Sequence, residues 1–369
     1  MKKRFLGVLL SVAMVAAVLA GCGSSGAKET TAPATGSETE AASEAASGET
    51  EAAGNTGDVI TVGFSQVGAE SDWRTANSES MKSTFSTENG YNLIFDDAQQ
   101  KQENQIAAIR NFIQQEVDYI VLAPVTESGW DTVLQEAKDA EIPVIIVDRM
   151  VDVSDDSLYT AWVGSNFKLE GQKACEWLKQ YAAAKNMSEV NIVDIQGTIG
   201  ASAQIGRTEA LNEAVEANGW NLLAQQTGEF TQAKGQEVME SMLKQYDNIN
   251  VVYCENDNEA FGAIEAIKAA GKTVGPDGDI LVMSFDTTKQ GITDTLSGDI
   301  IVNTECNPLH GPRVEQIIKQ LQAGETPEKQ AYVEEGIYAH GSDVASVSID
   351  GTDYEVTEVT QDVVDARAY

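Results

Sequence analysis

The feature that most constrains the fold is a regular alternation of short apolar runs with amphipathic stretches between Val59 and Gly336. Such alternation is typical of βαβ units, in which helices cover both faces of a parallel sheet. Several runs, for example 142–147, are almost entirely aliphatic, as strands buried on both faces require. The predicted strands are 60–65, 92–96, 119–123, 144–148, 161–163, 191–195, 221–226, 251–254, 280–285 and 300–304.

These repeated units are too many for a single doubly wound domain of ordinary size. We therefore predict an α/β protein with two doubly wound lobes, and the first boundary is expected between Gly164 and Asn166. The tail beyond Tyr338 contains two further apolar stretches, 344–349 and 354–359, separated by Asp350-Gly351. An Asp-Gly pair between two short runs indicates a turn between two strands.

The N-terminus has the pattern of a secretory signal. Basic residues at positions 2–4 precede an apolar run over 5–20, which is too short for a typical membrane span, and small residues lead to Cys22. The sequence Leu19-Ala20-Gly21-Cys22 resembles a bacterial lipobox, which implies a signal peptide over 1–21 and lipidation of Cys22. The alternative is plain secretory cleavage, with Cys22 incidental.

Residues 22–57 are predicted to be the lipidated cysteine and a disordered acidic tether. The segment consists mainly of Gly, Ser, Thr, Ala and Glu, and it has no aromatic residue with which to offset the entropy of ordering. An anchor followed by a tether resembles Gram-positive lipoproteins. It implies an extracytoplasmic protein on the outer face of the cytoplasmic membrane, with the lipid anchor as its only membrane contact.

Composition argues against several kinds of partner and cofactor. A net charge of −34 repels nucleic-acid phosphates, so we expect no nucleic-acid partner. Cys175, Cys254 and Cys306 have no C-x-x-C spacing, and the chain has only two histidines, far apart at 310 and 340. We therefore expect no metal site, no cofactor and no histidine-based catalysis.

Polar residues follow many of the predicted strands, where parallel sheets form their ligand crevices. They are Ser65-Gln66, Asp96-Asp97, Pro124-Val125-Thr126, Asp148-Arg149, Gln196-Gly197-Thr198, Asn256-Asp257, Asp286-Thr287 and Glu305. The sequence thus favours a polar binding cleft at the strand ends.

These residues also carry a resemblance to a known family. The chain resembles type I periplasmic binding proteins of the ribose/galactose group, and within them the galactofuranose-binding components of bacterial ABC sugar importers. The similarity covers nearly all of 59–338. It rests on the ordered motifs at 62–68, 70–74, 99–106, 123–125, 137–143, 148–149, 196–198, 200–202, 235–241, 256–257 and 262–264.

The resemblance implies two lobes joined by a three-stranded hinge that close over a monosaccharide, which is then delivered to the permease of an ABC importer. Closure of this kind is a population shift that the ligand drives by contacting both lobes. The N-terminal lobe would comprise 59–165 plus about 306–332, and the C-terminal lobe and tail 166–305 plus about 333–369. We expect a monomer, and no enzymatic activity.

The resemblance also implies a set of ligand-binding residues. Trp73 suits stacking on a sugar face, although it could instead pack on the surface of its lobe. Asp148 and Arg149 could pair with each other or direct hydrogen bonds at hydroxyl groups. The full set is Ser65, Glu70, Trp73, Arg74, Asp148, Arg149, Asn166, Arg207, Asn256, Asp257, Asp286 and Glu305.

Several of these residues have a second interpretation. Asp257 could be the N-cap of the helix that follows, and Arg207 an exposed charge on a helix. Asn166 and Glu305 lie where the chain is expected to cross between lobes. The family commonly has glycine after the aspartate at 286, whereas this chain has Thr287, which puts the shape of that loop in doubt.

Three other functions share parts of this pattern. A glycosidase would need two carboxylates about 5–5.5 Å apart, a separation that sequence cannot exclude. A sugar-responsive repressor would need a DNA-binding headpiece where this chain has a signal peptide and tether. The alternative that we retain is a receptor that binds a sugar or autoinducer and docks on a membrane sensor.

Overall fold

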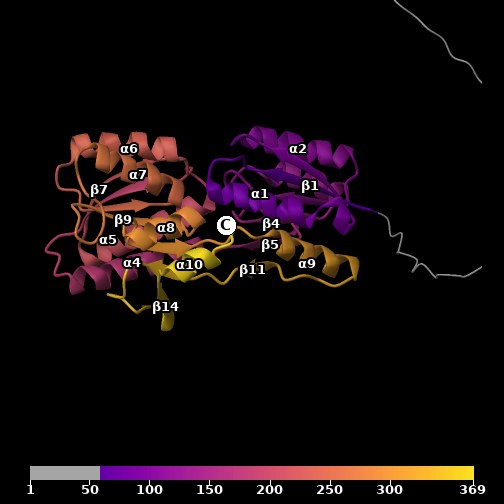
Figure 1. Ribbon diagram of the computed structural model, residues 1–369. Helices are drawn as coiled ribbons and strands as arrows, with labels where there is room; N and C mark the ends of the chain where they lie inside the picture. The colour runs from indigo at the N-terminus through magenta and orange to yellow at the C-terminus, as the bar shows by residue number, and fades with distance from the viewer. Residues whose placement is uncertain (1–58) are drawn as a thin grey trace, which may run out of the picture. The chain divides into compact units, whose positions relative to one another are not determined.

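The structure, a computed structural model, describes residues 59–369, which lie within one compact unit spanning 57–369. They form two α/β lobes, so the predicted fold class is confirmed (Figure 1). All ten predicted strands are present with ends within two residues of those expected. The predicted signal peptide, Cys22 and the tether lie outside the described residues.

The N-lobe is built on a six-stranded parallel sheet. Its elements are β1 (Ile60–Gln66), α1 (Asp72–Thr84), β2 (Tyr91–Asp97), α2 (Gln102–Gln114), β3 (Tyr119–Leu122), α3 (Asp131–Asp139), β4 (Val144–Val147), β5 (Ala161–Gly164), α9 (Gly311–Gln322) and β11 (Gln330–Tyr332). The strand order is β11-β5-β4-β3-β1-β2. Alternate residues of β4 enter separate cores on the two faces, Ile145 on one and Ile146 on the other, which explains its continuous aliphatic sequence.

The C-lobe is built on an eight-stranded mixed sheet. Its elements are α4 (Phe167–Ala184), β6 (Asn191–Gln196), α5 (Ser202–Asn218), β7 (Asn221–Thr227), α6 (Gln232–Gln245), β8 (Val251–Cys254), α7 (Asp257–Ala269), β9 (Leu281–Asp286), α8 (Lys289–Ser297), β10 (Val302–Glu305), β12 (Ile337–Ala339), β13 (Ser346–Ile349), β14 (Thr352–Glu358) and α10 (Gln361–Ala366). The order is β13-β14-β12-β10-β9-β8-β6-β7. The predicted turn at Asp350-Gly351 joins the antiparallel hairpin of β13 and β14.

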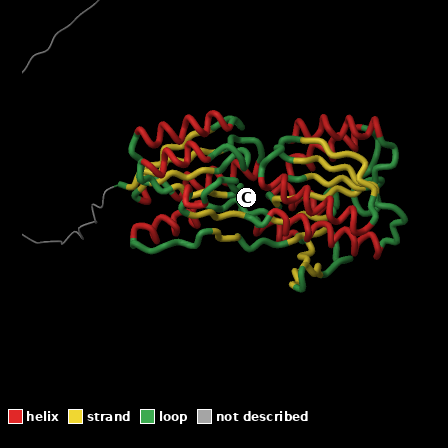
Figure 2. Tube along the Cα trace, turned by 180° about the vertical axis from the view of Figure 1, so that it is seen from behind, coloured by secondary structure: helices red, strands yellow, loops and turns green. Residues whose placement is uncertain are grey.

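The chain passes between the lobes three times. The crossings follow β5 at Ser165, β10 at Cys306, and β11 over 333–336. Figure 2 shows the strands of each lobe lying between helices. Several helices begin at a side-chain N-cap, including Ser71 of α1 and Asn256 of α7, and these helix starts follow the carboxyl ends of strands. Among residues 59–369, no helix combines the length and apolarity needed to cross a bilayer.

The C-lobe sheet contains a buried carboxyl that predicts a pH dependence. Asp194 in β6 is fully buried; its Oδ2 accepts a hydrogen bond from Gln225 Nε2 at 3.0 Å, while its Oδ1 has no partner among residues 59–369. Burial raises the pKa of this carboxyl to about 7, whereas an unfolded aspartate titrates near 4. Between these values the folded state binds more protons, so the free energy of unfolding falls as pH rises from about 4 to about 7.

Asp194→Asn lacks this titration. The free energy of unfolding of the variant minus that of wild type should therefore increase by about 2–4 kcal/mol when the pH is raised from about 4.5 to about 8. The size follows because each pKa unit corresponds to about 1.4 kcal/mol. Urea unfolding of both proteins at the two pH values measures the difference. If the difference in unfolding free energy between the two proteins is the same at both pH values, Asp194 titrates normally in the folded state.

Candidate ligand-binding site

A cavity lies between the two lobes at the carboxyl ends of their strands. The empty space within it is ≈ 280 Å³, which includes space open to solvent. The lining residues come from both lobes and from the second crossing. They are Glu70, Ser71, Trp73, Arg74, Asp148, Arg149, Phe167, Ala203, Arg207, Phe230, Asn256, Asp286 and Cys306.

The N-lobe side of the cavity is a buried network of alternating charges. Arg74 Nη2 contacts Asp148 Oδ2 at 2.7 Å, and its Nε contacts Glu70 Oε1 at 3.2 Å. Arg149 Nη2 contacts the same Glu70 oxygen at 2.9 Å, and its Nη1 donates to the Val125 carbonyl. Arg149 lies 4.0 Å from Asp148, so the two sequence neighbours each pair more closely with a residue of the 70–74 segment.

Burial and pairing have opposite effects on these charges. Burial opposes ionisation of Asp148, but the charges of Arg74 and Arg149 outweigh it and lower the pKa of the carboxyl below its ordinary value. For Arg74, burial is outweighed by Asp148 and Glu70, so the pKa of the guanidinium is raised. Arg149 differs, because burial dominates and lowers its pKa. Asp148 and Arg74 are therefore held in their charged forms.

Two atoms of this network have no partner. Arg74 Nη1 and Glu70 Oε2 are buried, and neither makes a hydrogen bond within the described protein. One is a donor and the other an acceptor, and leaving a buried polar group unpaired costs about 1–3 kcal/mol. A hydroxyl group, which donates and accepts, is suited to satisfy both.

The C-lobe side is centred on Arg207, which is buried rather than exposed on its helix. Arg207 Nη2 lies 2.8 Å from Glu170 Oε2 and 3.6 Å from Asp286 Oδ1. Burial raises the pKa of Asp286 well above its ordinary value, with Arg207 opposing the shift.

Asp286 and Thr287 have φ of 98° and 56°, the left-handed region in which threonine is strained. The loop in which threonine replaces the family's usual glycine therefore has a backbone conformation that favours glycine.

Aromatic side chains form the apolar part of the cavity. Trp73, Phe167 and Phe230 belong to one apolar cluster between the lobes, and Trp73 Nε1 donates to the Cys306 carbonyl at 2.7 Å. Trp73 therefore lies in the cavity wall and not on the lobe surface. Phe167 and Phe230 were not predicted, although Phe230 follows β7 and the strand-end rule could have found it.

Eight of the twelve predicted ligand-binding residues line the cavity, and they carry most of its charge. They are Glu70, Trp73, Arg74, Asp148, Arg149, Arg207, Asn256 and Asp286. Asn256 is also the N-cap of α7, where its Oδ1 accepts from the Glu259 amide and its Nδ2 donates to the Phe230 carbonyl.

The structure places the other four predicted residues away from the lining. Ser65 is fully buried within β1, and Asn166 is the N-cap of α4, accepting from the Leu169 amide. Asp257 begins α7 and bonds only scaffold groups, from Ser284, Thr288 and Asn303. Glu305 pairs with Arg367 and Tyr369 of the tail. The side chains of Asn166, Asp257 and Glu305 are thus paired with neighbours, whereas the Ser65 hydroxyl is buried without a hydrogen-bond partner among residues 59–369.

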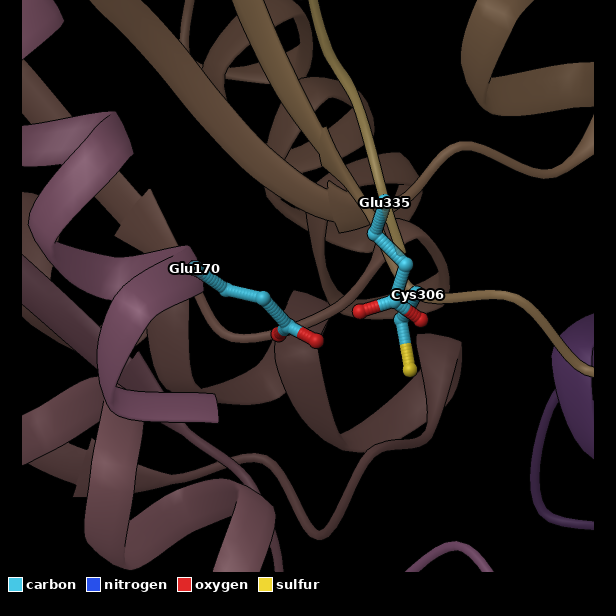
Figure 3. Close-up of side chains that lie close together, drawn as sticks. All are labelled: Glu170, Cys306 and Glu335. Atoms are coloured by element: carbon cyan, nitrogen blue, oxygen red, sulfur yellow. The ribbon is translucent and has the colours of Figure 1, made fainter. Parts of the chain in front are cut away.

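One group of side chains beside the cavity has the composition of a metal site. Glu170, Cys306 and Glu335 each offer a ligand atom, and within 59–369 these atoms lie within 4.8 Å of one another (Figure 3). Arg207 already pairs with Glu170, and Lys173 Nζ donates to the Glu335 carbonyl at 2.8 Å. Burial raises the pKa of both carboxyls. Carboxyl and thiol groups bind a metal ion in their deprotonated forms, so the raised pKa values and the pairing of Glu170 with Arg207 both oppose metal binding by this group.

Hydrogen bonds join the lobes at the rim of the cavity. The Asp72 amide donates to Asn258 Oδ1 at 3.0 Å, and the Met150 amide donates to Ser202 Oγ at 2.9 Å. The Glu127 amide bonds the Gly200 carbonyl at 2.9 Å. Because each bond joins an N-lobe residue to a C-lobe residue, the structure represents a closed form.

The Asn258 bond provides a test of closure. Asn258→Ala removes one interlobe hydrogen bond and no cavity-lining side chain, so it should weaken ligand binding about fivefold, corresponding to about 1 kcal/mol. Calorimetric titration measures the affinity, and urea unfolding of the free protein should be little changed. An unchanged affinity would show that this contact does not contribute to the liganded state.

Comparison with known proteins agrees with this geometry. A family described as "Periplasmic binding protein domain" matches residues 62–304. The galactofuranose-binding protein YtfQ of Escherichia coli is 42% identical over 284 residues, which cover 76% of this chain and 87% of that protein.

Solved structures agree as well. A Mycobacterium smegmatis protein in complex with β-D-fucofuranose has 44% identity and a TM-score of 0.73, covering 76% of this chain and 91% of that one. The periplasmic binding component of the arabinose ABC transporter of a Shewanella species, bound to L-arabinofuranose, has 42% identity and a TM-score of 0.71, covering 76% and 92%.

Proposed function

Since the chain belongs to the family of type I periplasmic sugar-binding proteins, we propose that it captures a monosaccharide, in furanose form, between its two lobes. The observation that carries this proposal is that two residues lining the cavity each have a buried polar atom without a partner among residues 59–369, Arg74 Nη1 and Glu70 Oε2. A neutral ligand rich in hydroxyl groups satisfies such pairs, and aromatic side chains suit the C–H faces of its ring.

The charge balance of the cavity supports a neutral ligand. Each of the three arginines meets at least one carboxylate, as Arg74 meets Asp148, Arg149 meets Glu70 and Arg207 meets Glu170. A strongly anionic or cationic ligand would have to displace one of these buried pairs, which costs several kcal/mol. Adjacent hydroxyls can instead accept from a guanidinium and donate to a carboxylate without breaking the pairing.

The furanose form is supported by the ligands of similar proteins, which include galactofuranose, fucofuranose and arabinofuranose. We infer further that the loaded protein delivers its sugar to an ABC importer and is held at the outer face of the membrane by a lipid on Cys22. The lipobox-like sequence ending at Cys22 and the sugar-import roles named for its relatives support that inference.

Thermal unfolding of the unit 57–369 against a panel of sugars tests the proposal. The panel comprises D-galactose, D-fucose, L-arabinose, D-ribose, D-fructose and myo-inositol. A ligand that binds only the folded state raises the midpoint of unfolding, by an amount that grows with its concentration. We expect galactose, fucose or arabinose to raise it. If no member of the panel changes the midpoint, the monosaccharide proposal is wrong.

A further inference from the structure

The last residues of the chain reach the hinge. After β14, the short helix α10 packs Val364 against Ile292 of α8 and Val359. Arg367 and Tyr369 follow this helix and contact Glu305, the residue before the second crossing. In Figure 1 the C-terminus lies beside the junction of the two lobes. The tail is therefore anchored on the C-lobe and ends on a hinge residue.

The contacts at Glu305 are close and mostly shielded from solvent. Arg367 Nη1 lies 2.7 Å from Glu305 Oε1, with side-chain exposures of 8% and 12%. The Tyr369 hydroxyl donates to the same oxygen at 2.9 Å, and the Gly336 amide donates to Oε2 at 2.9 Å. The Arg367 guanidinium also lies over the rings of Tyr338 and Tyr369. Glu305 thus joins the second crossing, the third crossing and the tail.

Glu305 lies directly beside a cavity residue. In the parallel pairing of β10 with β9, Glu305 is opposite Asp286, and the Cys306 amide donates to the Asp286 carbonyl. Asp286 and Thr287 have positive φ values, a strained backbone that persists only where neighbouring groups hold it. Asn303 Oδ1 holds the Thr287 amide from the same strand, β10. The position of the Asp286 carboxyl therefore depends on the end of β10.

The tail also balances the charge of the hinge. Three carboxylates gather there, Glu170, Glu305 and Glu335, and the charge of Glu305 contributes to the raised pKa of Glu335 after the larger effects of burial and Glu170. Arg207 and Lys173 are the cations beside Glu170 and Glu335. Arg367 is the cation that pairs with Glu305.

We propose that Arg367 and Tyr369 are positioning residues for ligand binding: by holding Glu305, they fix the end of β10 and with it the Asp286–Thr287 turn that presents a carboxyl to the cavity. This inference rests on the proposed sugar-binding function but assigns a role to residues outside the cavity. Neither side chain lines the cavity, so each is expected to act through Glu305 and Asp286.

The reactivity of Cys306 tests the proposal without a ligand. Cys306 follows Glu305 and lines the cavity; in this closed form it is 2% exposed and burial raises the pKa of its thiol, so its labelling rate in the ligand-free wild type is the reference for each variant. Arg367→Ala should increase severalfold the rate at which N-ethylmaleimide labels Cys306, as followed by mass spectrometry of the unit 57–369. Cys175 and Cys254, which are buried in the C-lobe cores, serve as internal references and should keep their wild-type rates.

Sugar affinity provides the second measurement. With the panel sugar that binds wild type, Arg367→Ala should weaken binding about tenfold and Tyr369→Phe less, in the range typical of residues that modulate a site without touching its ligand. Adding Glu305→Gln to Arg367→Ala should restore part of the affinity, because it removes the unpaired charge. Arg110→Ala is the matched control, since it breaks an exposed arginine–carboxylate pair with Glu136, far from the hinge, and should change neither measurement.

Three results would overturn the proposal. Wild-type Cys306 reactivity and affinity in a folded Arg367→Ala protein would show that the tail does not position the site. Equal acceleration of Cys175, Cys254 and Cys306 would indicate general destabilisation. If Arg367→Ala does not fold, a wild-type Cys306 labelling rate and a wild-type sugar affinity in Tyr369→Phe would likewise show that the tail does not position the site. If wild type binds no panel sugar, the proposed function fails separately, and the Cys306 rates still decide whether Arg367 holds the hinge.

Discussion

Replacing Asp148 with asparagine is expected to weaken sugar binding by about 30-fold or more. Truncating one partner of a buried hydrogen-bonded charge pair costs about 2–5 kcal/mol. Asp148 accepts from Arg74 Nη2 at 2.7 Å, and both side chains line the cavity. Its φ of 62° is left-handed, a conformation that asparagine tolerates well, so the substitution changes charge more than backbone. Calorimetric titration of the variant, after circular dichroism has shown it to be folded, gives the affinity.

The matched control for Asp148→Asn is Glu136→Gln. Glu136 forms a two-point contact with Arg110 at 2.7 Å and 2.8 Å, but both side chains are exposed, and solvent screens exposed pairs so that they contribute little. Glu136→Gln should leave affinity unchanged. Retention of wild-type affinity by Asp148→Asn would place the ligand elsewhere.

The second large effect is expected at Asp257, where Asp257→Ala should lower the free energy of unfolding by about 3–5 kcal/mol. Its carboxylate is fully buried and accepts from Ser284 Oγ, Thr288 N, Thr288 Oγ and Asn303 Nδ2 at 2.6–2.8 Å. Removing it leaves these donors unpaired between β9, α8 and β10. Urea unfolding at neutral pH measures the loss.

Sugar affinity distinguishes this scaffold role from the ligand contact that the sequence predicts. If Asp257 supports only the scaffold, folded Asp257→Ala protein should bind sugar within a few-fold of wild type. Asp299→Ala, which breaks an exposed pair with Lys268, is the control and should change neither quantity. A stable Asp257→Ala protein that no longer binds sugar would contradict the scaffold role.

The sequence predicted the fold well because its periodic pattern reports burial directly. A strand covered on both faces must be apolar throughout, as in 142–147, and its end is marked by the first polar residues, as at Asp148-Arg149. The strand-end rule also found three of the six charged side chains that line the cavity, Asp148, Arg149 and Asp286, because parallel strands deliver their ends to one edge. The other three, Glu70, Arg74 and Arg207, were predicted from the family resemblance.

The predictions at Ser65, Asn166, Asp257 and Glu305 show what the pattern does not resolve. A strand-end position indicates the edge of the sheet, but not which way a side chain points or what already pairs with it. Asn256 and Asp257 are adjacent, yet one lines the cavity while the other is turned into the scaffold. The side-chain partners of Glu305, Arg367 and Tyr369, lie more than sixty residues away, a separation that local sequence does not encode.

Ring form is the most direct test of the central claim that the cavity selects a furanose. The unit 57–369 would be mixed in turn with D-galactose, D-fucose and L-arabinose labelled with carbon-13 at the anomeric position, freed of unbound sugar, and denatured in the cold for immediate spectra. We expect one sugar to be retained, and its released anomeric signal to be that of the furanose. Retention of a sugar that shows only pyranose signals would contradict the account.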